Sequence, residues 1–149
     1  MTDELPEINL KAIGVVRSEI KQPTKRQAAD VVSEIVIDSS LTESLDNLDE
    51  FSHIIVLYWI HKSRQPAPKK VRPMGNPEHD LMGVFATRSP DRPNPVGKAT
   101  VRLLERRKNI LIVKGLDAID GTPVIDIKPY IPGYDSVDNA QAPSWMVKR

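Results

Sequence analysis

A proline-rich segment at residues 86–97 holds two arginines whose spacing suits the binding of an anion. Its sequence is ATRSPDRPNPVG, in which Arg88 and Arg92 alternate with three prolines. Because proline fixes its own φ and restricts the residue before it, the segment should be a loop of defined shape. Arg88 and Arg92 would then be ready to bind a carboxylate or phosphate through paired hydrogen bonds. The alternative is that these arginines fix the loop to acidic groups of the protein itself.

A second unusual segment, GLDAIDGTPVIDIKPY at residues 115–130, places acidic residues around a turn and along a strand. Asp120 begins an Asp-Gly turn signal, since glycine readily adopts positive φ, and Asp117 lies just beyond a predicted strand end. Backbone groups of this turn could bind a small polar ligand. Asp126 and Lys128 share one face of the next predicted strand, because alternate residues of a strand point the same way. These two could simply form an ion pair.

The sequence predicts no metal site. It contains no cysteine, and its three histidines, His53, His61 and His79, show no metal-ligand spacing such as His-Glu-x-x-His. It also contains no Walker loop and no GxGxxG motif. The nucleotide-binding loops of α/β enzymes are therefore not expected either.

Charge is unevenly distributed, although the net charge of the chain is only +1. Residues 61–108 carry twelve basic and four acidic side chains, whereas residues 1–60 carry five basic and eleven acidic ones. A basic middle third suits a partner that bears phosphates, because neutralised phosphates release counterions and give sequence-independent affinity. A solvated basic face would show the same pattern.

The N-terminal region and the hydropathy pattern predict a protein of the cytoplasm. Asp3, Glu4 and Glu7 stand where a signal peptide needs basic residues and an apolar run. The longest apolar run, residues 54–60, is too short to cross a bilayer as a helix but has the length of a buried strand. We expect no membrane association.

Short β-rich segments follow one another between turns. Strands are predicted over residues 11–20, 30–37, 53–60, 83–86, 99–106, 110–116 and 124–128, and a short helix over 40–48. Without alternating strands and helices, this order favours a mainly β fold, a compact single-sheet antiparallel β-barrel with one or two short helices and long proline-rich loops. The length of 149 residues predicts one domain over 1–149, with an ordered core at about 8–134. The tail at 135–149 should lie over the barrel or a neighbouring subunit.

Five segments together resemble the TsaA/TrmO family, and their order and spacing match as well. They are IGVVRSE (13–19), KRQ (25–27), FSHIIVLYWIH (51–61), GVFATRSPDRPNPVGKATVRL (83–103) and GLDAIDGTPVIDIKPY (115–130). Departures from the family are Lys25, where proline is common, Asp91, where an aromatic residue is common, and Lys98 with Ala99, which replace Leu or Met followed by Ser. We expect no counterpart of the second domain carried by many bacterial members.

The resemblance implies a single-sheet β-barrel, usually a homodimer, that binds S-adenosylmethionine. It implies a methyltransferase that acts on the exocyclic nitrogen of threonylcarbamoyl-adenosine next to the tRNA anticodon. The implied cofactor contacts are Lys25, Arg26, Gln27, His61, Lys62, Arg88, Gly97, Lys98, Leu116, Asp117, Ala118 and Asp120.

A catalytic hypothesis follows from the implied acceptor, whose nitrogen bears a carbamoyl group and attacks a methyl sulfonium slowly unless its proton leaves. Asp126 could remove or orient that proton while Lys128 or Arg88 stabilises the developing negative charge. The tRNA phosphates and the threonyl carboxylate would be held by Arg92, Arg102, Lys69, Lys70 and Arg72. The base could stack on Tyr58, Trp59 or Tyr130, although such aromatics are more often core residues.

Two rival functions are compatible with the same residues. One is a non-catalytic module that binds S-adenosylmethionine or RNA and yields no product. The other is a methyltransferase for another small acceptor, which would lack the strongly salt-dependent RNA affinity that the basic middle third predicts.

Overall fold

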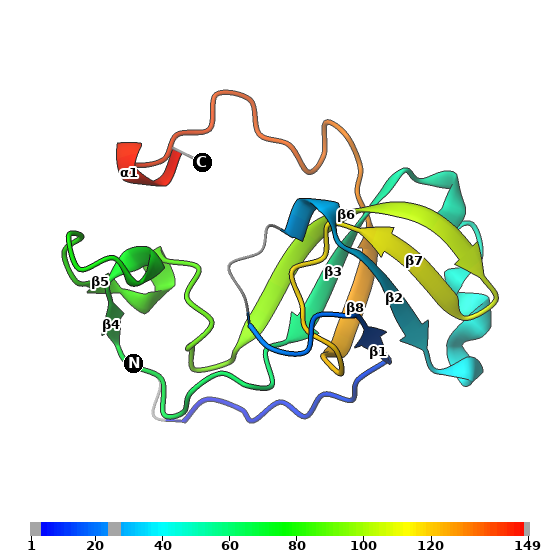
Figure 1. Cartoon of the computed structure of the whole chain (residues 1–149), viewed down its shortest axis with the longest axis horizontal. Coiled ribbons are helices and arrows are strands. Elements are labelled where there is room, and N and C mark those ends of the chain that lie inside the picture. The colour runs from blue at the N-terminus through cyan, green and yellow to red at the C-terminus, as the bar shows by residue number, and fades with distance from the viewer. Residues whose placement is uncertain (1–3, 24–27, 148–149) are drawn as a thin grey trace.

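The computed structural model describes residues 4–23 and 28–147 of the chain. Six antiparallel strands close into a barrel in the order β1, β2, β7, β6, β3, β8 (Figure 1). They are β1 (Gly14–Arg17), β2 (Val32–Ile37), β3 (His53–Trp59), β6 (Val96–Arg107), β7 (Ile110–Lys114) and β8 (Pro123–Pro129). The predicted mainly β, single-sheet barrel is confirmed.

The barrel interior is filled by side chains that alternate along each strand. In β3, Ile54, Val56 and Tyr58 are buried, whereas their neighbours on the outer face are half-buried. The interior is dominated by valine and isoleucine, whose branched side chains pack well on a pleated sheet. Burying each such side chain contributes about 1.5–3 kcal/mol, so this core is what holds the barrel ends in place.

Several predicted element boundaries change. The helix expected at 40–48 is two 3-10 helices, η2 (Ser39–Leu45) and η3 (Leu48–Glu50), which are separated because Asn47 adopts a φ of 72°. The strand expected at 83–86 is wrong for most of its length. Only β5 (Met82–Gly83) pairs, with β4 (Lys70–Val71), and then η5 (Val84–Ala86) turns the chain because the Thr87 backbone and hydroxyl both donate to the Val84 carbonyl.

The remaining described elements are η1 (Ala28–Asp30), η4 (Pro73–Gly75) and α1 (Ser144–Val147). After β8 the chain leaves the barrel and runs across to the β4–β5 region (Figure 1), where the rings of Trp145 and His79 lie 5.4 Å apart. Residues 131–140 of this tail are exposed. Within the described part of the chain, no helix is long and apolar enough to span a membrane.

Candidate functional site

A cleft of about 560 Å³ opens at one end of the barrel, a volume within the usual range for small-molecule sites. We call it the barrel-end cleft. Its walls come from the turn after β3 (60–64), the proline-rich loop (88–91) and the turn before β8 (116–122), with Tyr58 of β3 also lining it. The two motif segments recognised in the sequence, which are separated by a whole β-hairpin, therefore line one cavity.

A second and larger cavity, of about 760 Å³, lies elsewhere on the barrel. We call it the arm groove, because residues 6–10 of the N-terminal segment line it together with the outward side chains of Trp59, Val96 and Ile125. Glu7 is its one titratable lining residue. Convergent charged groups distinguish a reactive site from an apolar groove, so the smaller barrel-end cleft is the better candidate.

The proline-rich loop is held by its own hydrogen bonds. The buried Thr87 hydroxyl donates to the Val84 carbonyl at 2.7 Å, and the Arg92 guanidinium donates to the carbonyls of Thr87 and Ser89 at 2.8 and 3.2 Å. Arg92 also lies 5.9 Å from the centre of the Phe85 ring. Arg92 is thus used to stiffen the loop, through backbone carbonyls rather than the acidic groups considered from the sequence.

Arg88 has a different environment. Its side chain is exposed at the wall of the barrel-end cleft, and it makes no hydrogen bond or ion pair with the described residues. His61 and Lys62 also line the cleft and are exposed. These three side chains carry hydrogen-bond donors that no described residue uses, around one cavity, an arrangement suited to a ligand with anionic or hydrogen-bond-accepting groups.

The far side of the barrel-end cleft is built from Leu116, Asp117 and Ala118. The Tyr58 hydroxyl donates to the Asp117 carbonyl at 3.0 Å. Gly97 lies opposite Tyr58 in the β3–β6 ladder, and a Cβ at that position would overlap the Tyr58 ring. Gly97 does not itself line the cleft. Its contribution is that, without a side chain, it leaves space for the Tyr58 ring.

Asp120 anchors the turn rather than lining the cleft. One carboxylate oxygen accepts the Ser18 backbone N–H at 2.9 Å, and the other accepts the Lys21 ammonium at 3.0 Å. These two contacts, the Ser18 hydrogen bond first, lower the pKa of Asp120 below its ordinary value. The carboxylate therefore joins the turn before β8 to the chain that follows β1.

Asp126 and Lys128 are not brought to the barrel-end cleft within one chain. They form an ion pair of 3.1 Å on the outer face of β8, opposite Leu57 and Ile55 of β3. Asp126 lines a third cavity with residues of η2 and η3, at the other end of the barrel. The reason is that β8 advances by about 3.3 Å per residue away from the cleft. The structural ion pair considered from the sequence is what the chain forms.

The remaining predicted residues are scattered. Lys98 is exposed on the outer face of β6, opposite Leu57, and Arg102 on the same strand lies opposite His53, at the end of β3 far from the cleft. Lys69, Lys70 and Arg72 are exposed in and beside β4. The predicted cofactor contacts Lys25, Arg26 and Gln27 lie outside the described residues. Within residues 4–23 and 28–147, no three His, Asp or Glu side chains gather as a metal site would require.

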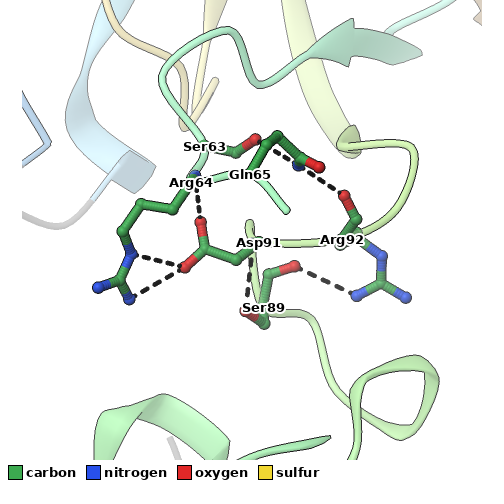
Figure 2. A network of polar contacts seen from close by, with 6 residues as sticks. All are labelled: Ser63, Arg64, Gln65, Ser89, Asp91 and Arg92. Atoms are coloured by element: carbon green, nitrogen blue, oxygen red, sulfur yellow. Dashed lines mark hydrogen bonds and ion pairs between the residues drawn. The ribbon is translucent and has the colours of Figure 1, made fainter. Parts of the chain in front are cut away.

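Sequence reasoning missed one charged contact at the cleft wall. Asp91 accepts the Arg64 backbone N–H at 2.7 Å and pairs with the Arg64 guanidinium at 3.1 Å (Figure 2). The two residues are 27 positions apart and neither belongs to a recognisable pairing pattern. The one indication in the sequence was that Asp91 stands where an aromatic residue is common in the TsaA/TrmO family.

The barrel, the proline-stiffened loop and the adjoining turn define a small β-barrel protein with a candidate ligand cleft at one end of the barrel. Residues 16–136 match the family model described as the tRNA-methyltransferase O N-terminal domain. The chain belongs to this family.

Relatives of two kinds are similar to this chain. An S-adenosyl-L-methionine-binding protein of Archaeoglobus fulgidus is 44% identical over 136 residues, which cover 89% of this chain and 96% of the relative. The tRNA (adenine(37)-N6)-methyltransferase of Escherichia coli K12 is 37% identical over 142 residues, covering 87% of this chain and 60% of the enzyme.

A solved structure shares the fold. The crystal structure of TrmO from P. aeruginosa superposes with a TM-score of 0.78 at 30% identity, covering 97% of this chain and 64% of that one. The chain also spans only 37% of the length of a second A. fulgidus relative, which is 46% identical. Several relatives therefore contain long stretches without a counterpart in this chain.

Proposed function

We propose that the protein is an S-adenosylmethionine-dependent methyltransferase that acts on the exocyclic nitrogen of threonylcarbamoyl-adenosine next to the tRNA anticodon. Family membership and the E. coli relative named as a tRNA (adenine(37)-N6)-methyltransferase support this proposal. The observation that carries it is the meeting of the two motif segments in the barrel-end cleft.

The residues of the cleft fit the proposed cofactor. Ala118 offers an apolar surface for a base, while Lys62 offers a cation for a carboxylate. Asp117 is exposed and offers a carboxylate for ammonium or hydroxyl groups. When bound, S-adenosylmethionine supplies an electrophilic methyl group on a sulfonium. The protein itself would supply alignment in a partly dry pocket, which accounts for much of the rate of such a transfer.

Charge stabilisation is the second task of the chain's residues. Loss of the acceptor proton would leave negative charge on the carbamoyl-substituted nitrogen. The Arg88 guanidinium lines the cleft without a hydrogen bond or ion pair to any described residue, and it would stabilise this charge. Lys69, Lys70 and Arg72 are exposed and could hold tRNA phosphates, together with those donors of Arg92 that no described residue uses. Asp126, Lys128 and Lys98 could act only at a site that a second chain completes, because they lie on the outer face of the barrel.

A homodimer in the cytoplasm is part of this proposal. The outer face of β3 carries Ile55, Leu57 and Trp59, whereas a barrel strand facing water usually carries polar residues. The arm groove continues this apolar face with Val96 and Ile125. A second copy that covered the face would bury it and would bring Lys98 or Asp126 near another chain. The cytoplasmic location follows from the proposed tRNA substrate.

Incubation with labelled S-adenosylmethionine and total tRNA, followed by nucleoside mass analysis, tests the proposed reaction. We expect one labelled product, the methylated form of threonylcarbamoyl-adenosine. The Arg88→Ala variant should give no product. Label recovered in a different nucleoside of the tRNA would contradict the proposed acceptor.

A second candidate is a non-catalytic S-adenosylmethionine-binding protein. The A. fulgidus relative that carries a binding-protein name is covered over 96% of its length, so it is nearly collinear with this chain. Cofactor binding without methyl transfer to tRNA would favour this candidate. Transfer to a small molecule with no salt-dependent RNA affinity would instead indicate a methyltransferase for another acceptor.

A further inference from the structure

Asp91 is the only charged residue among the buried residues that the structure describes, with 9% of its surface exposed. It lies in the middle of the proline-rich loop and lines the barrel-end cleft. A buried carboxylate is costly unless its oxygens accept hydrogen bonds, so its partners indicate its role.

Both oxygens of Asp91 accept hydrogen bonds from a single residue, Arg64 of the turn after β3 (Figure 2). Oδ1 accepts the backbone N–H of Arg64 at 2.7 Å, and Oδ2 accepts Nε and Nη2 of the same residue at 3.2 and 3.1 Å. The Asp91 backbone N–H in turn donates to the Ser89 hydroxyl at 3.2 Å. The carboxylate therefore joins the turn after β3 to the proline-rich loop.

The two contacts of Asp91 differ in their surroundings. The side chain of Arg64 is 90% exposed, whereas that of Asp91 is only 12% exposed. An ion pair with one exposed partner is screened by water and contributes little. The charge-assisted bond to the Arg64 backbone N–H is sheltered and short, so it is the contact that fixes the wall.

The bond lies close along the chain to cleft-lining residues of both segments. His61 and Lys62 precede Arg64 in the turn, and Arg88 precedes Asp91 in the loop, and all of them line the cleft. Two other links join the segments, from Ile60 N–H to the Pro95 carbonyl and from Gln65 to the Arg92 carbonyl, and both reach the loop after Asp91. Without Asp91 the middle of the loop would lose this charged contact with the turn.

We propose that Asp91 is a positioning residue, which holds Arg88 and the His61–Lys62 wall at the separation that the ligand of the barrel-end cleft needs, through the Arg64 backbone N–H. This inference rests on the proposed function, because it takes S-adenosylmethionine as that ligand. Asp91 does not touch the reacting atoms and acts through the two walls.

Calorimetric titration with S-adenosylmethionine tests the role in four variants. Asp91→Ala should raise the dissociation constant about 10-fold or more, because it removes a charge-assisted hydrogen bond. Arg64→Ala should raise it less than about 3-fold, because it removes only the screened pair. Asp91→Asn keeps an acceptor for the Arg64 N–H but turns amide donors toward the guanidinium. Asp91→Asn combined with Arg64→Ala should therefore bind as tightly as Arg64→Ala alone.

Asp46→Ala is the matched control, since Asp46 pairs with Arg106 at 3.0 Å away from the cleft. It should bind the cofactor as the parent does, and thermal melts would show that every variant is folded at the titration temperature. Parental affinity in Asp91→Ala would overturn the proposal, and so would equal losses in Asp91→Ala and Arg64→Ala.

Amide hydrogen exchange separates this inference from the proposed function. Exchange at the Arg64 N–H should rise in Asp91→Ala but much less in Arg64→Ala, whatever the ligand. If the parent protein did not bind S-adenosylmethionine, the proposed function would fail. The exchange rates would still decide whether Asp91 holds the turn after β3 in place. Unchanged exchange at Arg64 in Asp91→Ala would overturn the positioning role.

Discussion

The Tyr58 hydroxyl donates a hydrogen bond of 3.0 Å to the backbone carbonyl of Asp117, 59 residues further along the chain. Tyr58 is the last buried residue of β3, and Asp117 belongs to the turn that lines the barrel-end cleft. Burial raises the pKa of Tyr58 to about 12, and the charge of Asp117 adds to this while Arg88 opposes it. The phenol is therefore a proton donor at neutral pH, and it fixes the cleft turn to the core.

Tyr58→Phe should loosen that turn. Removing the hydroxyl leaves the Asp117 carbonyl without this donor, so the free energy of unfolding should fall by about 1 kcal/mol. Affinity for S-adenosylmethionine should fall as well. Urea unfolding and calorimetry would measure the two effects. Tyr130→Phe is the control, because the Tyr130 hydroxyl makes no hydrogen bond with the described residues; equal behaviour of both variants would argue against a role for the Tyr58 bond.

The same tyrosine predicts a difference in alkaline stability. The ordinary pKa of 10.0 applies to Tyr58 in the unfolded chain, and the folded value is about 12. Between these values the unfolded chain has lost the proton that the folded protein keeps, so stability falls as pH rises through this window. The loss in the parent should exceed that in Tyr58→Phe by on the order of 2–3 kcal/mol. A pH-independent difference between the two unfolding free energies would disagree with this.

Gly97→Ala should be harmful although the residue lines no cavity. An added Cβ would overlap the Tyr58 ring, and overpacking a core site costs about 1–3 kcal/mol. Gly83→Ala is the matched control, because a Cβ there meets no atom within 4 Å and Gly83 has an extended backbone. Thermal unfolding of the two variants would show a clear loss only for Gly97→Ala, and equal melting temperatures would refute the packing argument.

The strands of the barrel could be predicted from sequence, because they depend on local patterns. Alternating β-branched residues indicated β3, and the prolines around Arg88 indicated a stiff loop. The placement of Asp126 could not be predicted in the same way. Asp126 was a candidate because of the chemistry of the implied acceptor, but the extended strand carries it away from the cleft turn and places it on the outer face.

The long-range polar contacts were also beyond prediction. The Arg64–Asp91 pair joins two irregular segments, and no periodicity relates them. Likewise, Asp120 was expected at the cofactor, yet its carboxylate is used by Ser18 and Lys21. Which oxygen is free for a ligand depends on three-dimensional neighbours that a single sequence does not specify.

Asp120→Ala should lower the free energy of unfolding at neutral pH and lower it less in acid. Its pKa is lowered from 3.8 chiefly by the Ser18 backbone hydrogen bond and then by Lys21. A lowered carboxyl pKa gives stability that is present above the ordinary value and is lost as pH falls through the folded value. The gap between the parent and Asp120→Ala in chemical unfolding should therefore narrow below pH 3.8. A gap that stayed constant into acid would speak against these contacts.

The exposed lysines at β4 predict salt-dependent binding of RNA. Lys69→Ala and Lys70→Ala should each weaken tRNA binding, and each should reduce the slope of log affinity against log salt by about 1 if the lysine neutralises a phosphate. Lys11→Ala is the control, because Lys11 belongs to the acidic N-terminal third. Filter binding over a salt series would measure the slopes, and unchanged slopes in both β4 variants would remove this surface from the proposed interface.

We predict that S-adenosylmethionine binds in the barrel-end cleft and not in the larger arm groove. Backbone NMR shifts recorded during titration with the cofactor would distinguish the two cavities. The shifts should concentrate at residues 60–64, 88–91 and 116–119, the segments that line the barrel-end cleft. Shifts confined to residues 6–10 with Trp59 and Ile125 of the arm groove would contradict it.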